Sequence, residues 1–184
     1  MSKRCFIAIN LLPAAVKEID DLTLKLKKYY KNSVTGVQTK TAHLTLHFLG
    51  DLSDSQIEAV KDILENQVKD FKTAKLLTDK ISAFPNLNEP KIIYLSGQQI
   101  GNESLSLLQN KVGEELNKIG IKTENRPWTP HLTLARVKSP IIFKPDNFDP
   151  PKLEIPVTSI ELMASQLSSI GPEYKILASY NLKY

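Results

Sequence analysis

The sequence predicts an α+β fold. Three segments repeat apolar residues at steps of three and four, which is typical of amphipathic helices. About seven other segments have strand patterns. Several of these follow one another with no helix between them, which favours α+β over a doubly wound parallel sheet. The tetrapeptide His-Leu-Thr-Leu occurs twice, from His43 and from His131, at matching places in the two halves of the chain. We therefore also expect an imperfect duplication.

The first half is predicted to alternate between strands and helices. Pro13 suits the first turn of a helix, where its missing N–H costs nothing, and an apolar stripe follows it. Ser53 and Gln56 form a capping-box pattern that begins the second helix. The predicted elements are a strand at 4–10, a helix from Pro13 to about Tyr29, a strand at 42–49 ended by Gly50, and a helix that carries its stripe to Val68.

The second half repeats this alternation and then ends in strands. Residues 84–90 are rich in Pro and Asn and are expected to form a loop. A helical stripe begins near Asn102 and stops at Gly120. The remaining predicted elements are strands at 74–83, 91–95 and 131–137, a loop-like tail at 140–156, and strands at 157–164 and 174–183.

Composition narrows the class of protein. With 184 residues, 41% of them hydrophobic, the chain is globular and long enough for one domain or two small lobes. A net charge of +4 is compatible with an anionic ligand but far below that of a dedicated duplex-binding protein. The single cysteine, Cys5, excludes an intrachain disulfide and a Cys-based metal cluster, and a cytoplasmic location is expected. No stretch is apolar for long enough to span a membrane.

The repeated tetrapeptide has the pattern of a site. In a strand, side chains alternate between faces, so each copy places His and Thr on one face and both Leu on the other. Two imidazoles suit proton transfer at both ends of one displacement, because one can act as base while the other acts as acid near neutral pH. A phosphodiester is the natural substrate. Thr45 and Thr133 would then direct hydroxyls at the non-bridging phosphate oxygens. This chemistry needs no metal.

Four segments resemble the 2H phosphoesterase superfamily, and within it the RNA 2′,3′-cyclic phosphodiesterases, also known as 2′-5′ RNA ligases. The two motifs read HLTLHFLG from His43 and WTPHLTLAR from Trp128. Residues 4–9 resemble the opening strand of the family. Ser165-Gln166-Leu167 and Gly171-Pro172-Glu173-Tyr174 resemble its closing signature.

The resemblance implies one bilobal domain over residues 1–184. Two pseudo-symmetric α/β lobes, each a largely antiparallel sheet with outer helices, would enclose a central cleft. It also implies hydrolysis of RNA 2′,3′-cyclic phosphate ends to 2′-phosphomonoesters without metal or cofactor, and in some members reversible 2′-5′ ligation. By analogy His43 is the acid and His131 the base, although the two identical motifs leave that order open. RNA ends or nucleotide 2′,3′-cyclic phosphates are the expected partners, with no membrane and no protein partner.

Four further residues have competing interpretations. Arg136 is a candidate substrate contact, but regular alternation places it on the Leu face, which leaves a surface ion pair equally open. Trp128 could stack on a base or pack against the neighbouring lobe. His47 would lie on the face of His43, about 13 Å away at about 3.3 Å per residue, too far to share a metal or a proton. It is expected to be a rim or partly buried residue. Phe48 is assigned to the core.

Three other functions compete with this hypothesis. The first is a cyclic phosphodiesterase for small nucleotides or 2′-5′ oligonucleotides. The second is a non-catalytic RNA-binding module whose histidines only contact phosphate. The third is a His-dependent metallohydrolase, which is disfavoured because three histidines, two of them far apart on one strand, make a poor ligand set.

Overall fold

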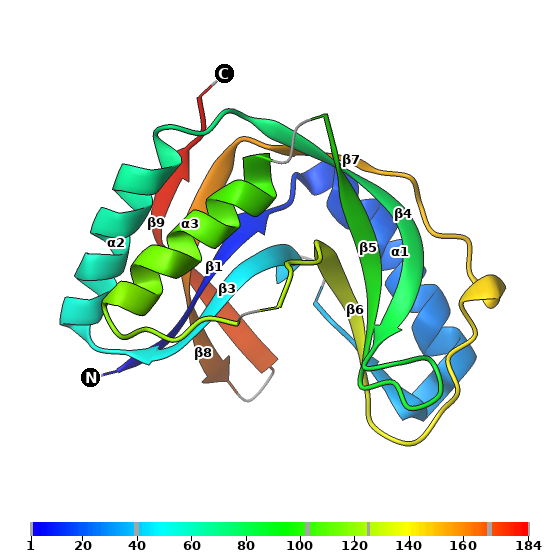
Figure 1. The fold of residues 1–184 in the computed structure, drawn as a ribbon. Helices are drawn as coiled ribbons and strands as arrows, with labels where there is room; N and C mark the ends of the chain where they lie inside the picture. Colours follow the sequence, from blue (N-terminus) through cyan, green and yellow to red (C-terminus); the bar gives the residue numbers. More distant parts are fainter. Residues whose placement is uncertain (1, 39–40, 102–103, 125, 169–170, 184) are drawn as a thin grey trace.

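The computed structural model describes residues 2–38, 41–101, 104–124, 126–168 and 171–183. It confirms the α+β class (Figure 1). The strands of the described residues form one sheet in the order β7-β4-β5-β6-β3-β1-β8-β9, and β2 also pairs with β6. Every pairing between these strands is antiparallel. The sheet therefore lacks the parallel crossovers of a doubly wound fold, as the strand–strand neighbours in the sequence predict.

The sheet divides into two lobes at the boundary between β3 and β6. In the described part of the chain, the register across this boundary consists of one residue pair, Leu44 opposite Leu132. The first lobe holds β1 (Lys3–Asn10), β3 (His43–Leu52), β8 (Ser159–Ser168) and β9 (Gly171–Asn181). The second lobe holds β2 (Val34–Gly36), β4 (Ala74–Phe84), β5 (Ile92–Ile100), β6 (His131–Val137) and β7 (Glu154–Val157).

Each lobe takes a helix from the other half of the chain. Helix α1 (Pro13–Tyr30) packs on β2 and β6 of the second lobe, whereas α2 (Asp54–Val68) and α3 (Ser104–Lys118) pack together over the first lobe, α2 on β3 and β9 and α3 on β3 (Figure 1). Two short 3₁₀ helices, η1 (Lys31–Ser33) and η3 (Pro145–Asn147), lie in the connections. The helices are therefore exchanged between the two halves.

The apolar stripes and the motif leucines form the core. Leu44, Leu46, Leu132 and Leu134 are all buried, which confirms that the Leu face of each motif points inward. The capping box is present, since the backbone N–H of Gln56 donates to Ser53 Oγ at 3.3 Å. The buried stripe residues are Ile19, Leu22 and Leu26 of α1, Ile57, Val60 and Leu64 of α2, and Leu105, Leu108, Val112 and Leu116 of α3.

Several predicted boundaries are wrong. The strand of the first motif does not end at Gly50 but continues to Leu52, because Gly50 takes a positive φ of 72° next to a bulge at Leu49. The pattern also missed the short strands β2 and β7, the latter inside the expected loop at 140–156. The closing strand begins at Gly171 rather than at 174. The expected helix start at Asn102 lies outside the described residues, and α3 begins at Ser104.

Candidate active site

A bulge interrupts each motif strand at the same place. In β3, Ala8 is opposite Thr45 and Ile7 is opposite His47, so Leu46 is an extra residue. In β6, Tyr94 is opposite Thr133 and Ile93 is opposite Ala135, so Leu134 is extra. A bulge of this kind shifts the alternation of the strand by one residue. The residues after each bulge therefore change face relative to a regular strand.

The bulge in β3 overturns two predictions. His47 lies with the leucines on the core face and is only 4% exposed, not on the face of His43. Its Nε2 is 2.7 Å from the backbone oxygen of Gln109 in α3. Phe48 was assigned to the core but is 60% exposed. It lies opposite Phe6, whose ring contacts that of His43, so Phe48 is on the same face as the motif histidine.

The bulge in β6 gives Arg136 the matching position. Arg136 is exposed and lies opposite Ile92, which in turn lies opposite Phe84. The ring of Phe84 contacts that of His131, so Arg136 shares the face of the second motif histidine. None of the ion pairs found among the described residues includes it. Arg136 therefore projects on the face of His131, toward the end of β6, and sequence alternation alone pointed the other way.

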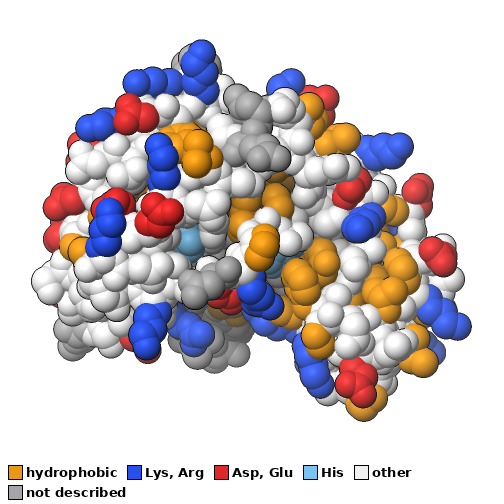
Figure 2. Space-filling model, in the orientation of Figure 1, with side chains coloured by type: hydrophobic (Ala, Val, Ile, Leu, Met, Phe, Trp, Pro, Cys, Tyr) orange, Lys and Arg blue, Asp and Glu red, His pale blue; other side chains and the backbone are white. Residues whose placement is uncertain are grey.

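The two motif histidines are oriented in the same way. Nδ1 of His43 is 2.7 Å from the carbonyl oxygen of Thr41, and Nδ1 of His131 is 2.8 Å from that of Thr129. A carbonyl oxygen only accepts, so each Nδ1 carries the hydrogen and donates it. In the neutral ring Nε2 is then left with a lone pair. Figure 2 shows histidine side chains near the middle of one face, between the two halves of the molecule.

Aromatic rings enclose each histidine. The ring centroids of Phe6 and Tyr174 lie 4.8 and 5.1 Å from that of His43. Those of Phe84 and Tyr94 lie 5.2 and 5.5 Å from that of His131. These contacts restrict both imidazoles to one orientation. None of these rings was assigned to the site from sequence, although Phe6 and Tyr174 lie in segments that resemble the family. They come from strands β1, β9, β4 and β5, far from the motifs in the chain.

Burial lowers the pKa of His43 below its usual value. Loss of hydration is the main cause, because it disfavours the charged imidazolium. The hydrogen bond to Thr41 opposes this effect, and the charge of His131 adds to it. The register across Leu44 and Leu132 brings the two motif histidines to the same boundary between the lobes.

The threonines complete the arrangement. The register of Leu44 with Leu132 sets Thr45 across from His131 and Thr133 across from His43. Directly opposed residues in an antiparallel pair have Cβ atoms about 4.5–5.5 Å apart, and diagonal residues such as the two histidines about 7–8 Å. The register therefore brings both threonines and both histidines to one boundary between the lobes.

Trp128 connects the two lobes. It lies in the segment before β6, and its indole N–H donates to the carbonyl oxygen of Thr45 at 2.9 Å. The ring is partly buried and packs against the main core. Of the two interpretations of Trp128, packing against the neighbouring lobe matches this placement.

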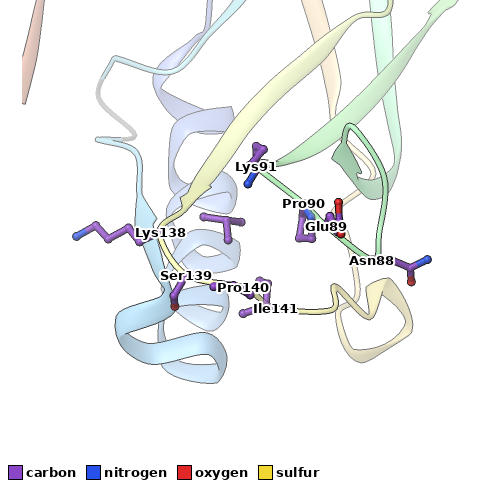
Figure 3. Close-up of a pocket in the computed structure, with 9 residues that line it drawn as sticks. Asn88, Glu89, Pro90, Lys91, Lys138, Ser139, Pro140 and Ile141 are labelled. Atoms are coloured by element: carbon purple, nitrogen blue, oxygen red, sulfur yellow. The ribbon is translucent and has the colours of Figure 1, made fainter.

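A pocket elsewhere in the second lobe lacks such chemistry. It is lined by residues 88–91 before β5 and 137–141 after β6, at the far end of these strands from His131 (Figure 3). Lys138 and Asn88 point away from it. In the part of the chain that the structure describes, no three His, Cys, Asp or Glu side chains gather as metal ligands would, and no helix is long and apolar enough to cross a membrane.

Known proteins resemble this chain over most of its length. The family model of the 2′-5′ RNA ligase superfamily matches residues 11–167. The chain belongs to this superfamily. Two relatives of this chain are named RNA 2′,3′-cyclic phosphodiesterase. The one from Thermotoga maritima is 28% identical over 95% of this chain and 92% of its own. The one from Aquifex aeolicus is 27% identical over 90% and 92%. The predicted family is confirmed.

Solved structures share the fold of this chain. A protein of Thermus thermophilus superposes with a TM-score of 0.83 at 22% identity and covers 98% of both chains. LigT of E. coli, solved in complex with 3′-AMP, superposes with a TM-score of 0.80 at 23% identity and covers 100% of both chains. At this level of identity the likeness establishes the architecture of the two lobes.

Proposed function

We propose that this protein hydrolyses RNA 2′,3′-cyclic phosphate ends to 2′-phosphomonoesters by paired-histidine catalysis. The observation that carries the proposal is the pair of imidazoles on facing strands. Each donates through Nδ1 to a carbonyl two residues back, which leaves Nε2 for proton transfer. The relatives named RNA 2′,3′-cyclic phosphodiesterase support this substrate class.

The proposed reaction is one displacement at phosphorus. A neutral imidazole removes a proton from water, the water oxygen attacks phosphorus, and the bond from phosphorus to the 3′ oxygen breaks. An imidazolium gives its proton to the departing 3′ oxygen, and the 2′ ester bond remains. Thr45 and Thr133 donate to the non-bridging oxygens, where negative charge grows. The same displacement, with a 5′ hydroxyl in place of water, would form a 2′-5′ linkage, and its reverse would cleave that linkage to a cyclic phosphate.

We propose His43 as the acid and His131 as the base, the order that the family resemblance implies. Burial lowers the pKa of His43 and so favours its neutral imidazole in the free protein. A bound phosphate counters this, because a nearby negative charge stabilises imidazolium. A substrate with sulfur in place of the 3′ oxygen tests the order, since a departing thiolate needs no proton. Such a substrate should restore turnover to His43→Ala and not to His131→Ala.

We propose that Phe48 contacts the base next to the cyclic phosphate and that Arg136 contacts the RNA on the other side of the histidine pair. Both project from the face that carries the histidines, one from each lobe. An aromatic face stacks on any base, and a guanidinium on the other side of the histidine pair can bind a further phosphate of the RNA. This arrangement favours a nucleotide over a small inorganic ester.

The single cysteine is buried, which suits a reducing compartment such as the cytoplasm.

The decisive experiment measures 2′,3′-cyclic phosphate hydrolysis in EDTA by wild type, His43→Ala and His131→Ala. Each substitution should reduce kcat at least about 100-fold, the low end for positioned acid–base catalysis. His47→Gln is the matched control, because this histidine lies on the opposite face and should leave kcat near wild type. A fully active His43→Ala or His131→Ala variant would refute the two-histidine mechanism. Activity abolished by EDTA would instead support a metallohydrolase.

The same assay separates the remaining alternatives. Cyclic-ended RNA should be turned over with a higher kcat/KM than 2′,3′-cyclic mononucleotides or 2′-5′ oligonucleotides. The opposite ranking would assign the protein to small nucleotides or 2′-5′ oligonucleotides. Retained RNA binding without turnover at any pH would identify a binding module.

A further inference from the structure

Three consecutive residues before β6 each form a hydrogen bond to a different strand. The indole N–H of Trp128 donates to the carbonyl of Thr45 in β3, at 2.9 Å. The carbonyl of Thr129 accepts from Nδ1 of His131 at 2.8 Å. The carbonyl of Pro130 accepts from the backbone N–H of Gly97 in β5 at 3.0 Å. A shift of this segment would therefore move the first motif relative to the second.

The sheet alone gives the boundary between the lobes little support. The described register between the two motif strands consists of Leu44 opposite Leu132. The neighbouring pairs β1·β3 and β5·β6 have registers of several residues. The contact from Trp128 crosses this boundary one residue beyond the Leu44 pair and joins the backbone of Thr45 to the other lobe.

We propose that Trp128 is a positioning residue that fixes the distance between the two motifs through its N–H. The proposal rests on the proposed function, because the groups that it spaces are the phosphate-binding Thr45 and the base His131. In-line displacement requires water, phosphorus and the departing oxygen to lie on one line between the two imidazoles. A misplacement of about 1 Å can reduce a rate about 100-fold. A bond to the backbone of Thr45 therefore acts on kcat rather than on ground-state binding.

Substitution of Trp128 by Phe tests this inference, because it keeps an aromatic ring and removes the N–H donor. We expect kcat for cyclic phosphate hydrolysis to fall about 10-fold while KM changes less than about 2-fold, since only the spacing of the motifs is disturbed. Tyr30→Phe is the matched control. It also removes a long-range donor, the hydroxyl at the end of α1 that donates to the carbonyl of Ile142 at 3.4 Å and accepts from the backbone N–H of Lys144 at 3.1 Å. Its kcat should equal that of wild type even where its melting temperature falls as much as that of Trp128→Phe.

Intrinsic fluorescence provides a second readout, because Trp128 is the only tryptophan in the chain. If the indole stays bonded to Thr45, saturation with a nucleoside 2′-monophosphate should leave its emission nearly unchanged. Strong quenching, together with a raised KM and unchanged kcat in Trp128→Phe, would overturn the proposal and make Trp128 a base-stacking residue. If the wild type is active and Trp128→Phe has an unchanged kcat, the positioning role is rejected while the proposed function stands. An inactive wild type rejects the proposed function instead.

Discussion

Phe48 and Arg136 hold equivalent positions in the two lobes. Each is the sixth residue of its motif, each follows a bulge at a leucine, and each is exposed on the face of its histidine. The two motif strands therefore share their geometry and differ in the side chain at this position. One lobe presents an apolar ring and the other a cation. Antiparallel strands run in opposite directions from the Leu44–Leu132 pair, so a bound RNA would meet different chemistry on the two sides of the histidines.

Removal of Phe48 should weaken substrate binding. Stacking of a base on an aromatic ring contributes about 1–3 kcal/mol, which corresponds to about a 5-fold to 150-fold rise in KM for Phe48→Ala. The melting temperature should hardly change, since the ring is already 60% exposed. Leu107→Ala removes a similarly exposed apolar side chain from α3 and is the control. An unaltered KM in Phe48→Ala would exclude a stacking role.

The pH profile of kcat/KM should respond to the rings around His43. Burial lowers the pKa of His43, so the limb that this residue sets lies below its usual value of about 6.5. Tyr174→Ala admits water to the imidazole, favours its charged form and should move that limb to higher pH. Tyr174→Phe keeps the ring and should leave the limb in place. A profile that is identical in both variants would mean that His43 does not set either limb.

Stability should fall with acidification because of His47. Burial lowers the folded-state pKa of this imidazole, so the unfolded chain binds the proton more readily than the folded protein. The contribution to the free energy of unfolding is complete above about pH 6.5, the unfolded value, and declines as the pH falls toward the folded pKa. Urea denaturation at several pH values should show this decline, with a smaller slope in His47→Gln. An equal slope in both proteins would assign the acid sensitivity to other groups.

Substitution of Gly113 by Ala should destabilise the protein. Ala normally favours a helix interior over Gly by about 1 kcal/mol, but a Cβ here would lie 2.9 Å from Cε1 of His47. His47 is held by its bond to Gln109, so we expect a net loss of about 1–3 kcal/mol from overpacking. In a His47→Ala background the same change should be neutral or stabilising. Equal effects in both backgrounds, measured in a double-mutant cycle, would contradict this contact.

The periodicity of apolar residues was sufficient to predict the helices and strands that bury one face. The stripes of α1, α2 and α3 and the alternation within each His-Leu-Thr-Leu motif predicted the helices, the motif strands and their buried leucines. The capping box at Ser53 was predicted from two residues and is present. These features are local, so they can be read from a short stretch of sequence. The assignment of the catalytic residues remains a prediction.

The features that depend on partner strands were not predictable in this way. The bulges at Leu46 and Leu134 are defined by the residues opposite them in β1 and β5, which no periodicity within the motif reveals. For this reason Phe48 and His47 were assigned to the wrong faces, and Arg136 stayed open. The bond from Trp128 to Thr45 spans 83 residues of sequence and likewise has no local signal.

The exchange of helices makes the two halves of the site dependent on each other. The strand of His131 is covered by α1, which precedes the first motif, and the strand of His43 is covered by α3, which precedes the second. A chain folded in only its second half would leave β6 without α1, and one folded in only its first half would leave β3 with α2 but without α3. Neither histidine strand is therefore complete until both halves of the chain have come together. Two separately expressed fragments should regain activity only when mixed.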